Sequence, residues 1–320
     1  MTKKRILTGI KPSGALHLGN YFGALKPFVE SVKETDDEVF LMVADYHALT
    51  TLHNKEEMRN NTIDLVKNYL AAGVDPARVV LFRQSDNLHH FELGWIFNCL
   101  VSVPFLMQAH AYKDRINKGE EANAGLFTYP MLMAADIVLY DADEIPVGED
   151  QRQHIEYARE AVGKFNRTFG DTLKTPYEKI TKNVGIIPGT NGQKMSKSYK
   201  NVIPFLGETE EIRKAVMSIV TDSSGERPEN VYQLHKVVFE NTGRDLAELD
   251  ALYAENVGKY KNLKDALLMD IEKLIAPMRE KKQAISDEEV KKVLAEGAEK
   301  GRAVSEKVMS RVRTAIGINW

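Results

Sequence analysis

Two short motifs that stand far apart along the chain constrain its fold more than any other feature. His17–Asn20 (HLGN) follows the turn-forming segment Gly9–Gly14, and Lys194–Ser198 (KMSKS) lies past the middle of the sequence. Backbone N–H groups at the start of a helix favour phosphate, so the first motif predicts a nucleotide cradle. The two lysines of the second motif suit a pyrophosphate, although a basic run alone is often only a solvated loop. Together, in this order, the motifs predict an enzyme that cleaves ATP between its α and β phosphates.

The first part of the chain alternates short apolar segments with a helical pattern. Short apolar runs suit strands that are buried in a parallel sheet. Three such strands are predicted: Arg5–Ile10, Glu38–Ala44 and Arg78–Arg83. Lys55–Ala72 has helical spacing between the second and the third, so the pattern predicts a doubly wound parallel α/β sheet, a Rossmann-like nucleotide fold. Ligands of such sheets bind beyond the carboxyl ends of the strands, where His17, His47 and Gln84 fall.

The rest of the chain divides into an insertion, a second part of the sheet and a helical end. Residues 104–143 have a helical pattern rich in aromatic residues, which predicts an insertion between the two halves of the nucleotide fold. Ile145–Val147 resumes a strand and Gln151–Phe165 is predicted to form a helix. After about residue 204, helices rich in Lys, Glu and Ala are predicted to the end. The expected domains are therefore residues 1–203, for nucleotide binding, and residues 204–320, an all-helical domain.

Composition excludes several classes of protein. With 43% hydrophobic residues the 320-residue chain can form one large or two medium domains, and its net charge of −3 gives no overall basic field for nucleic acid. The single cysteine, Cys99, excludes a disulfide framework and a cysteine zinc cluster, and its apolar neighbours predict that it is buried. No signal peptide is recognisable, and no segment approaches the ~20 apolar residues of a membrane span. A cytoplasmic protein without membrane or DNA partners is therefore expected.

These motifs resemble the two signatures of the class I aminoacyl-tRNA synthetases. The KMSKS motif matches letter for letter, whereas the first motif ends in Asn20, where many members carry a second histidine. Leu126–Tyr140 (LFTYPMLMAADIVLY) and Ile145–Glu156 (IPVGEDQRQHIE) are similar to the tryptophanyl branch of that family, and the resemblance runs from about residue 5 to the C-terminus. It implies an enzyme that activates tryptophan with Mg²⁺-ATP and transfers it to tRNA(Trp). It also implies that the helical domain meets the tRNA anticodon.

The predicted ATP site combines the two motifs with a turn after the fourth strand. Lys194 and Lys197 are expected to stabilise charge that develops on the leaving pyrophosphate, and His17 and Asn20 are the other candidate catalytic residues. The alternative for His17 is a helix-capping role, and the alternative to ribose binding for Asp150 is an N-cap. The resemblance implies this ATP-binding set: Lys11, Pro12, Ser13, Gly19, Asn20, Gly148, Glu149, Asp150, Ile187, Lys194, Met195, Ser196, Lys197 and Ser198. Lys11 stands where related enzymes often carry Gln.

The predicted amino-acid pocket is built on a helix. Tyr129, Met133, Asp136 and Tyr140 are spaced by four, three and four residues, so they form one stripe. A carboxylate among apolar neighbours is costly to bury without a partner, and the sequence offers no other partner for Asp136 nearby. The resemblance supplies the indole N–H of tryptophan as that partner. It implies this tryptophan-binding set: Leu7, Tyr129, Met133, Asp136, Ile137, Val147 and Gln151.

Three other readings remain open. A tyrosyl-type ligase has the same fold but needs acceptors for a phenol hydroxyl. An adenylyltransferase that never meets tRNA shares the nucleotide fold but lacks a long helical end. A regulatory paralogue without activity would not need both Lys194 and Lys197. The resemblance further implies a homodimer built partly from residues 85–125, where Trp95–Met107 is unusually apolar, and no protein-bound metal is expected.

Overall fold

Two groups of parallel strands form the central sheet of the computed structural model, which describes residues 3–147, 152–180, 186–221 and 227–319. The first group has the order β1 (Arg5–Ile10), β2 (Glu38–Val43) and β3 (Val79–Arg83). The second group pairs β4 (Ile145–Val147) with β5 (Glu178–Ile180). Leu7 N donates to Glu144 O over 3.2 Å, which places β4 beside β1. The strand order β3-β2-β1-β4-β5 is the doubly wound arrangement that the sequence predicted. Successive strands are added on one side of β1 up to β3 and on its other side from β4, so the order of addition reverses between β1 and β4, while the strands stay parallel.

The sheet is buried on both faces because alternate residues of its strands enter two different cores. Val39, Leu41 and Val43 of β2 pack with α2 (Lys26–Lys33) and α4 (Lys55–Ala71). Phe40 and Met42 point the other way, into a core with helices of the insertion. A strand that is apolar at every position after its first residue, Glu38, therefore fits the centre of this sheet.

The insertion is helical. It contains α6 (Val103–Leu106), α7 (His110–Asn117) and α8 (Ala124–Val138), and it is preceded by α5 (His89–Leu100). After β4, α9 (Arg152–Phe169) packs against α8. The shorter elements lie in the connections: α1 (Leu18–Asn20), the π-helical turn η1 (Tyr21–Leu25), α3 (Asp45–Ala48), and the 3-10 turns η2 (Gln84–Asp86) and η4 (Lys197–Tyr199).

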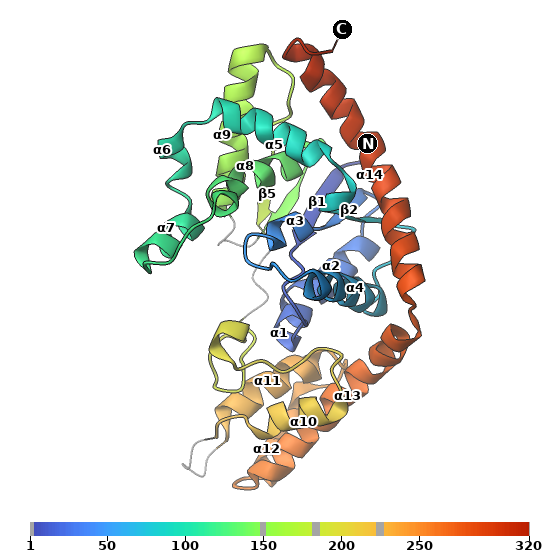
Figure 1. The fold of residues 1–320 in the computed structure, drawn as a ribbon. Coiled ribbons are helices and arrows are strands. Elements are labelled where there is room, and N and C mark those ends of the chain that lie inside the picture. The colour runs from blue at the N-terminus through green and yellow to red at the C-terminus, as the bar shows by residue number, and fades with distance from the viewer. Residues whose placement is uncertain (1–2, 148–151, 181–185, 222–226, 320) are drawn as a thin grey trace.

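The C-terminal part of the chain is a group of helices from which the last one returns to the sheet. The members are α10 (Thr209–Met217), α11 (Glu229–Glu240), α12 (Leu246–Glu255), α13 (Tyr260–Ala284) and α14 (Asp287–Ala315). Figure 1 shows α14 running along one side of the molecule, from this group to the far end. A Cβ on Gly297 would lie 1.9 Å from Leu81 O, so only glycine allows α14 to cross β3 this closely. The boundary at residue 204 stays a prediction, and α14 is shared between the two predicted domains.

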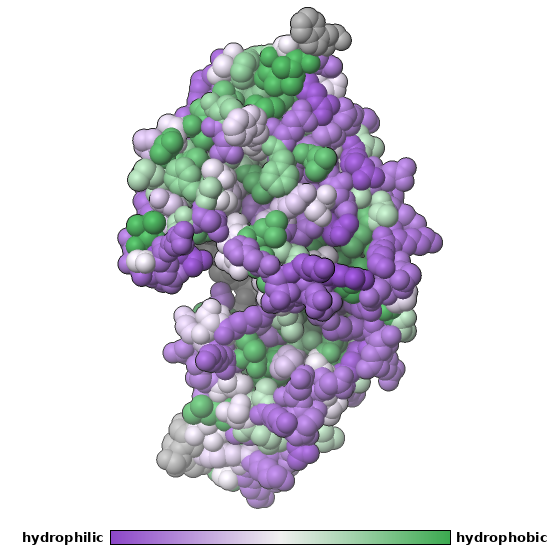
Figure 2. All heavy atoms as spheres, in the orientation of Figure 1, coloured by the Kyte–Doolittle hydropathy of each residue, from purple (hydrophilic) through white to green (hydrophobic). Residues whose placement is uncertain are grey.

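Cys99 is exposed, so the prediction that it is buried was wrong. Leu93 and Phe97 face the core from α5, and a residue two positions after Phe97 points to the opposite side of a helix. That outer side carries exposed apolar side chains, including Trp95 at 71% exposure. Figure 2 shows hydrophobic side chains gathered over the upper part of the view, where α5 lies in Figure 1. Within the part of the chain that the structure describes, no helix has both the length and the apolar character needed to cross a membrane.

Candidate active site

His17 and Asn20 cap the helix that follows β1. His17 N donates to Asn20 Oδ1 over 3.1 Å, and Asn20 N donates back to His17 Nδ1 over 3.2 Å. Burial and the nearby Lys197 lower the pKa of His17 to about 4, so its ring is neutral at pH 7. Since Nδ1 accepts, the ring proton stands on Nε2. The capping role that the sequence left open for His17 is therefore real, and it leaves one N–H of the ring as a donor.

Gly19 and Met195 join the two motifs directly. Gly19 N donates to Met195 Sδ over 3.2 Å, and Met195 is buried. A Cβ on Gly19 would lie 2.9 Å from His17 Nδ1 and 3.1 Å from Met195 Cβ. Glycine is thus required where the HLGN turn meets the KMSKS loop, although the sequence interpretation assigned Gly19 to contact with ATP.

The lysines of the site have no acidic partner among the residues that the structure describes. Lys197 Nζ donates to the carbonyl oxygen of Ser13 over 2.8 Å, and partial burial lowers the pKa of Lys197. Lys11 Nζ donates to Thr51 Oγ1 over 3.2 Å, and burial lowers its pKa as well. Lys194 is exposed. Among the described residues none of these three lysines pairs with a carboxylate, so the loop presents uncompensated positive charge to an anion.

Asn201 fixes the shape of the KMSKS loop, and the sequence interpretation missed it. Its side chain is 1% exposed and its Oδ1 accepts from Ser196 N over 2.8 Å. Its Nδ2 donates to Asn191 Oδ1 over 2.7 Å and to Lys194 O over 3.1 Å. The sequence feature that could have identified Asn201 is its amide side chain, three residues after the KMSKS motif, in a segment otherwise typical of a solvated loop. Ile187, buried beside Met195, accepts from Met195 N over 2.9 Å.

Asp136 is buried, but the expectation that it lacks a protein partner was wrong. Its Oδ1 accepts from His90 Nδ1 over 2.6 Å and from Gln84 Nε2 over 2.8 Å. Its Oδ2 accepts from His47 Nε2 over 2.7 Å and from the same Gln84 nitrogen over 2.9 Å. Burial alone would raise the pKa of this carboxyl, yet the hydrogen bonds from His47 and His90 outweigh burial and lower the pKa to about 2. Sequence reasoning placed His47 and Gln84 at this edge of the sheet but missed His90.

Most other residues of the predicted tryptophan pocket belong to or pack against one hydrophobic core. Leu7 and Ile137 are buried in one core cluster, and Met133 and Val147 pack against it. The ring of Tyr129 stands edge-on to the rings of His47, 6.2 Å away, and His154, 5.7 Å away. The four predicted site residues of the turn after β4 lie outside the described residues: Gly148, Glu149, Asp150 and Gln151.

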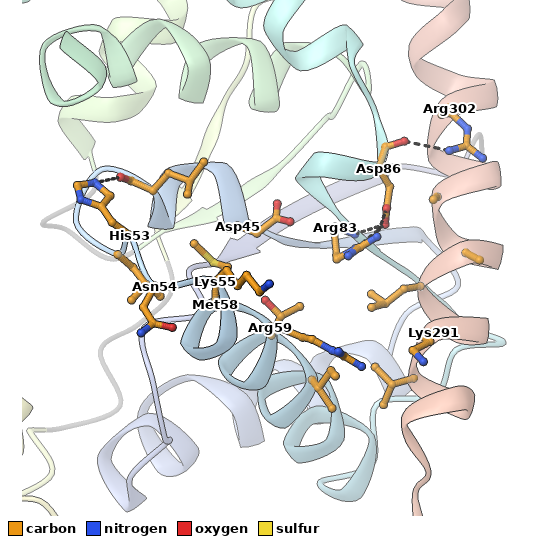
Figure 3. A pocket seen from close by; sticks show the side chains of 18 residues that line it. Asp45, His53, Asn54, Lys55, Met58, Arg59, Arg83, Asp86, Lys291 and Arg302 are labelled. Atoms are coloured by element: carbon orange, nitrogen blue, oxygen red, sulfur yellow. Dashed lines mark hydrogen bonds and ion pairs between the residues drawn. The ribbon is translucent and has the colours of Figure 1, made fainter. Parts of the chain in front are cut away.

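Two cavities lie near this site. One of about 530 Å³ is lined by His47, Tyr129 and the exposed Trp95. The other, of about 620 Å³, lies between α4 and α14 and is drawn in Figure 3. None of the predicted ATP or tryptophan residues lines the second cavity, which instead contains Asp45, whose carboxylate accepts from Ser85 N over 3.0 Å. Within the described ranges, no group of three or more metal-ligating side chains is arranged to hold a metal ion.

Known proteins resemble this chain over nearly its whole length. A family model described as class I tRNA synthetases (W and Y) matches residues 2–301. The tryptophan–tRNA ligase of Fusobacterium nucleatum is 41% identical over 98% of this chain and 98% of its own. That of Rhodopirellula baltica is 41% identical over 98% of this chain and 99% of its own. A crystal structure of tryptophanyl-tRNA synthetase from Campylobacter jejuni complexed with ADP and tryptophan has a TM-score of 0.90 at 35% identity, covering 98% of this chain and 99% of that one.

Proposed function

The chain belongs to the class I tRNA synthetases of the tryptophan and tyrosine group, and from that premise we propose how its site joins tryptophan to tRNA(Trp). It is an ATP-dependent tryptophan–tRNA ligase. The observation that supports the site assignment most is the direct contact between Gly19 and Met195, because it brings the KMSKS lysines to the nucleotide turn beside β1.

In the first step the carboxylate of tryptophan attacks the α-phosphorus of ATP, which enters as its Mg²⁺ complex. The bond between the α-phosphorus and the bridging oxygen breaks, and pyrophosphate leaves. Lys194 and Lys197 stabilise the charge on that leaving group, and His17, whose Nδ1 accepts from Asn20 N, donates from Nε2–H to a phosphate oxygen. In the second step the 3′-terminal hydroxyl of the tRNA attacks the carbonyl carbon, and AMP leaves. Neither step needs a protein nucleophile.

Recognition of the indole ring centres on Asp136. A carboxylate offers about four acceptor positions, and three donor atoms already use them, because the single Gln84 nitrogen is shared by both oxygens. The side chain of His90 is fully buried, whereas that of His47 is 13% exposed, so the open approach to the carboxylate is on the His47 side. We place the indole N–H against Oδ2 there, between Met133 and Tyr129, with the α-amino group toward Tyr129 and Gln151.

Assembly and location complete the proposal. A homodimer is favoured by exposed apolar side chains on one surface, which are Leu88, Phe91, Trp95, Val103 and Met107. The helical part from residue 204 to residue 320, α10–α14, is the proposed tRNA anticodon-binding domain. Because tRNA charging serves translation, the enzyme is proposed to act in the cytoplasm.

The test is ATP–pyrophosphate exchange with each of the twenty amino acids, followed by transfer to tRNA. We expect exchange with tryptophan alone and transfer to tRNA(Trp). Lys197→Ala should lower exchange by ~100-fold, the scale of losing one preorganised stabiliser, while tryptophan binding without ATP is unchanged. Exchange with tyrosine, or exchange with tryptophan that never continues to tRNA, would contradict the assignment.

A further inference from the structure

A line of buried polar groups connects Asp136 to the C-terminal helix. His90 Nε2 lies 2.8 Å from the hydroxyl of Tyr140, which lies 3.1 Å from Asn87 Nδ2. The same Asn87 nitrogen lies 2.8 Å from Ser305 Oγ, on α14. His90, Tyr140, Asn87 and Ser305 are each at most 1% exposed. Five side chains from three segments of the chain thus form one continuous hydrogen-bonded line away from water.

The protons in this line have one consistent arrangement. Asn87 Oδ1 accepts from His89 N over 3.2 Å, so the amide nitrogen of Asn87 faces Tyr140 and Ser305 and donates to both. The oxygen of Tyr140 therefore accepts from Asn87, and its own proton has one acceptor in the line, His90 Nε2. A ring that accepts at Nε2 carries its proton on Nδ1, which donates to Asp136. The hydrogen bonds from Asn87 to Tyr140, from Tyr140 to His90 and from His90 to Asp136 are therefore all donated toward the carboxylate.

The helix α14 is held firmly where it contributes Ser305. Arg313 donates to both carboxylate oxygens of Glu92 on α5, over 2.7 and 2.6 Å. Arg302 donates to Asp86 O over 2.9 Å, a contact that Figure 3 shows at the top of the cavity. Ser305 Oγ also contacts His89 Nδ1 at 2.9 Å. These contacts tie α14 to the segment that carries Gln84 and His90, the two donors to Oδ1 of Asp136.

We infer that His90, Tyr140, Asn87 and Ser305 are positioning residues for the carboxylate that reads the indole N–H, and that α14 is thereby part of the amino-acid site. The inference rests on the proposed role of Asp136. A buried carboxylate selects a ligand by one hydrogen bond only if its orientation and charge are fixed, because a carboxylate that turns away loses the bond and its selectivity. Tyr140 fixes the tautomer of His90, His90 fixes Oδ1, and Oδ2 is thereby held on the side of His47, where the indole N–H is proposed to join the donors His47 and Gln84.

The experiment compares tryptophan with β-(benzothien-3-yl)alanine, in which sulfur replaces the indole N–H at nearly the same shape. Dissociation constants are measured by calorimetry on the full-length protein without ATP. Tyr140→Phe removes one hydroxyl from the line and should weaken tryptophan about fivefold, the value of one ordinary hydrogen bond, while the analogue binds as before. Ser305→Ala should change the tryptophan-to-analogue ratio in the same direction by a smaller factor.

Matched controls are available in the same chain. Tyr253→Phe removes another buried hydroxyl that lies 3.2 Å from a histidine ring, that of His235, in the helical group. Ser310→Ala alters an exposed serine of α14. Neither should change the ratio.

The outcomes separate the two claims. Suppose that the unaltered enzyme prefers tryptophan, but that Tyr140→Phe and Ser305→Ala leave the tryptophan-to-analogue ratio unchanged or weaken the binding of both ligands equally. The positioning role of these residues is then wrong, and the role of Asp136 stands. If the unaltered enzyme binds both ligands equally, Asp136 does not read the indole N–H and both claims fall.

Discussion

At the scale of the residue, His17 is held neutral by its position between a helix cap and a lysine. Its Nδ1 must stay unprotonated to accept from Asn20 N, and burial, together with the nearby Lys197, disfavours a positive charge on the ring. The same neutrality leaves Nε2–H as a donor to the nucleotide. The cap and the proposed catalytic contact therefore depend on one protonation state.

This dependence predicts a pH effect on stability. The pKa of His17 is about 4 in the folded protein against an ordinary 6.5, so the unfolded chain binds the proton more readily between these values. Stability that is present above pH 6.5 is lost as the pH falls toward 4, by about 1–2 kcal/mol between pH 7 and 5. His17→Asn keeps a capping oxygen but does not titrate, so its urea-unfolding free energy should fall less over that interval. An equal fall in both proteins would show that His17 does not carry this proton.

The surroundings of Asp136 could be predicted from the sequence only in part. Helical spacing and an acidic residue among apolar ones were enough to predict a buried carboxylate in a pocket. The donors come from three other elements, since His47 lies on α3, Gln84 follows β3 and His90 is on α5. Pairing between distant segments has no local signature in the chain. His89 and His90 stand side by side at the start of an apolar helix, and the sequence gave no reason to expect that His90 faces inward.

At the scale of the element, the KMSKS loop is a small structured unit. Gly189 N donates to Gln193 O over 2.7 Å, closing the turn, and Asn201 holds its other end. Gly192 has a φ of +79°, and a Cβ there would lie 2.2 Å from Asn230 Oδ1 on α11. The loop is thus shaped by its own hydrogen bonds and seated against the helical group.

Asn201 tests whether that shape matters for catalysis. Asn201→Ala removes the acceptor for Ser196 N and the donors to Asn191 and Lys194, so the lysines lose their fixed positions. We expect ATP–pyrophosphate exchange to fall by at least ~10-fold, mainly through a raised KM for ATP, because misplaced catalytic groups cost orders of magnitude in rate. Tryptophan binding without ATP should stay the same. The comparison variant is Asn241→Ala, which alters an amide that donates to Val237 O in α11. A loss of tryptophan binding that matches the loss of exchange would indicate general unfolding instead.

The order and type of the main elements could be predicted because they follow from local patterns. Strands β1 to β4 and helix α4 lie within a residue or two of their predicted ranges. The return of α14 to β3 was not predicted, since Gly297 in a helical sequence does not reveal which backbone it approaches. The exposure of Cys99 on α5 was not predicted for a related reason, because an apolar run does not show which of its faces is covered.

At the scale of the whole molecule, α5 has two contrasting sides. His90 points inward to Asp136, while Phe91 and Trp95 are exposed on the outer side. The outer residues also line the cavity beside His47 and Tyr129. An interface that covers α5 would therefore lie one helix away from the amino-acid pocket.

The last prediction concerns that interface. Trp95→Asp combined with Val103→Asp places two charges on the apolar surface, and burying an unpaired charge against a second copy is strongly unfavourable. We expect sedimentation equilibrium at micromolar concentration to give twice the 36.1 kDa chain mass for the unaltered protein, and the single-chain mass for the double variant. Met269 is as exposed as Trp95, at 71%, but lies on α13 in the helical group, so Met269→Asp is the matched control and should stay dimeric. A monomeric unaltered protein would refute the dimer, and a dimeric double variant would move the interface away from α5.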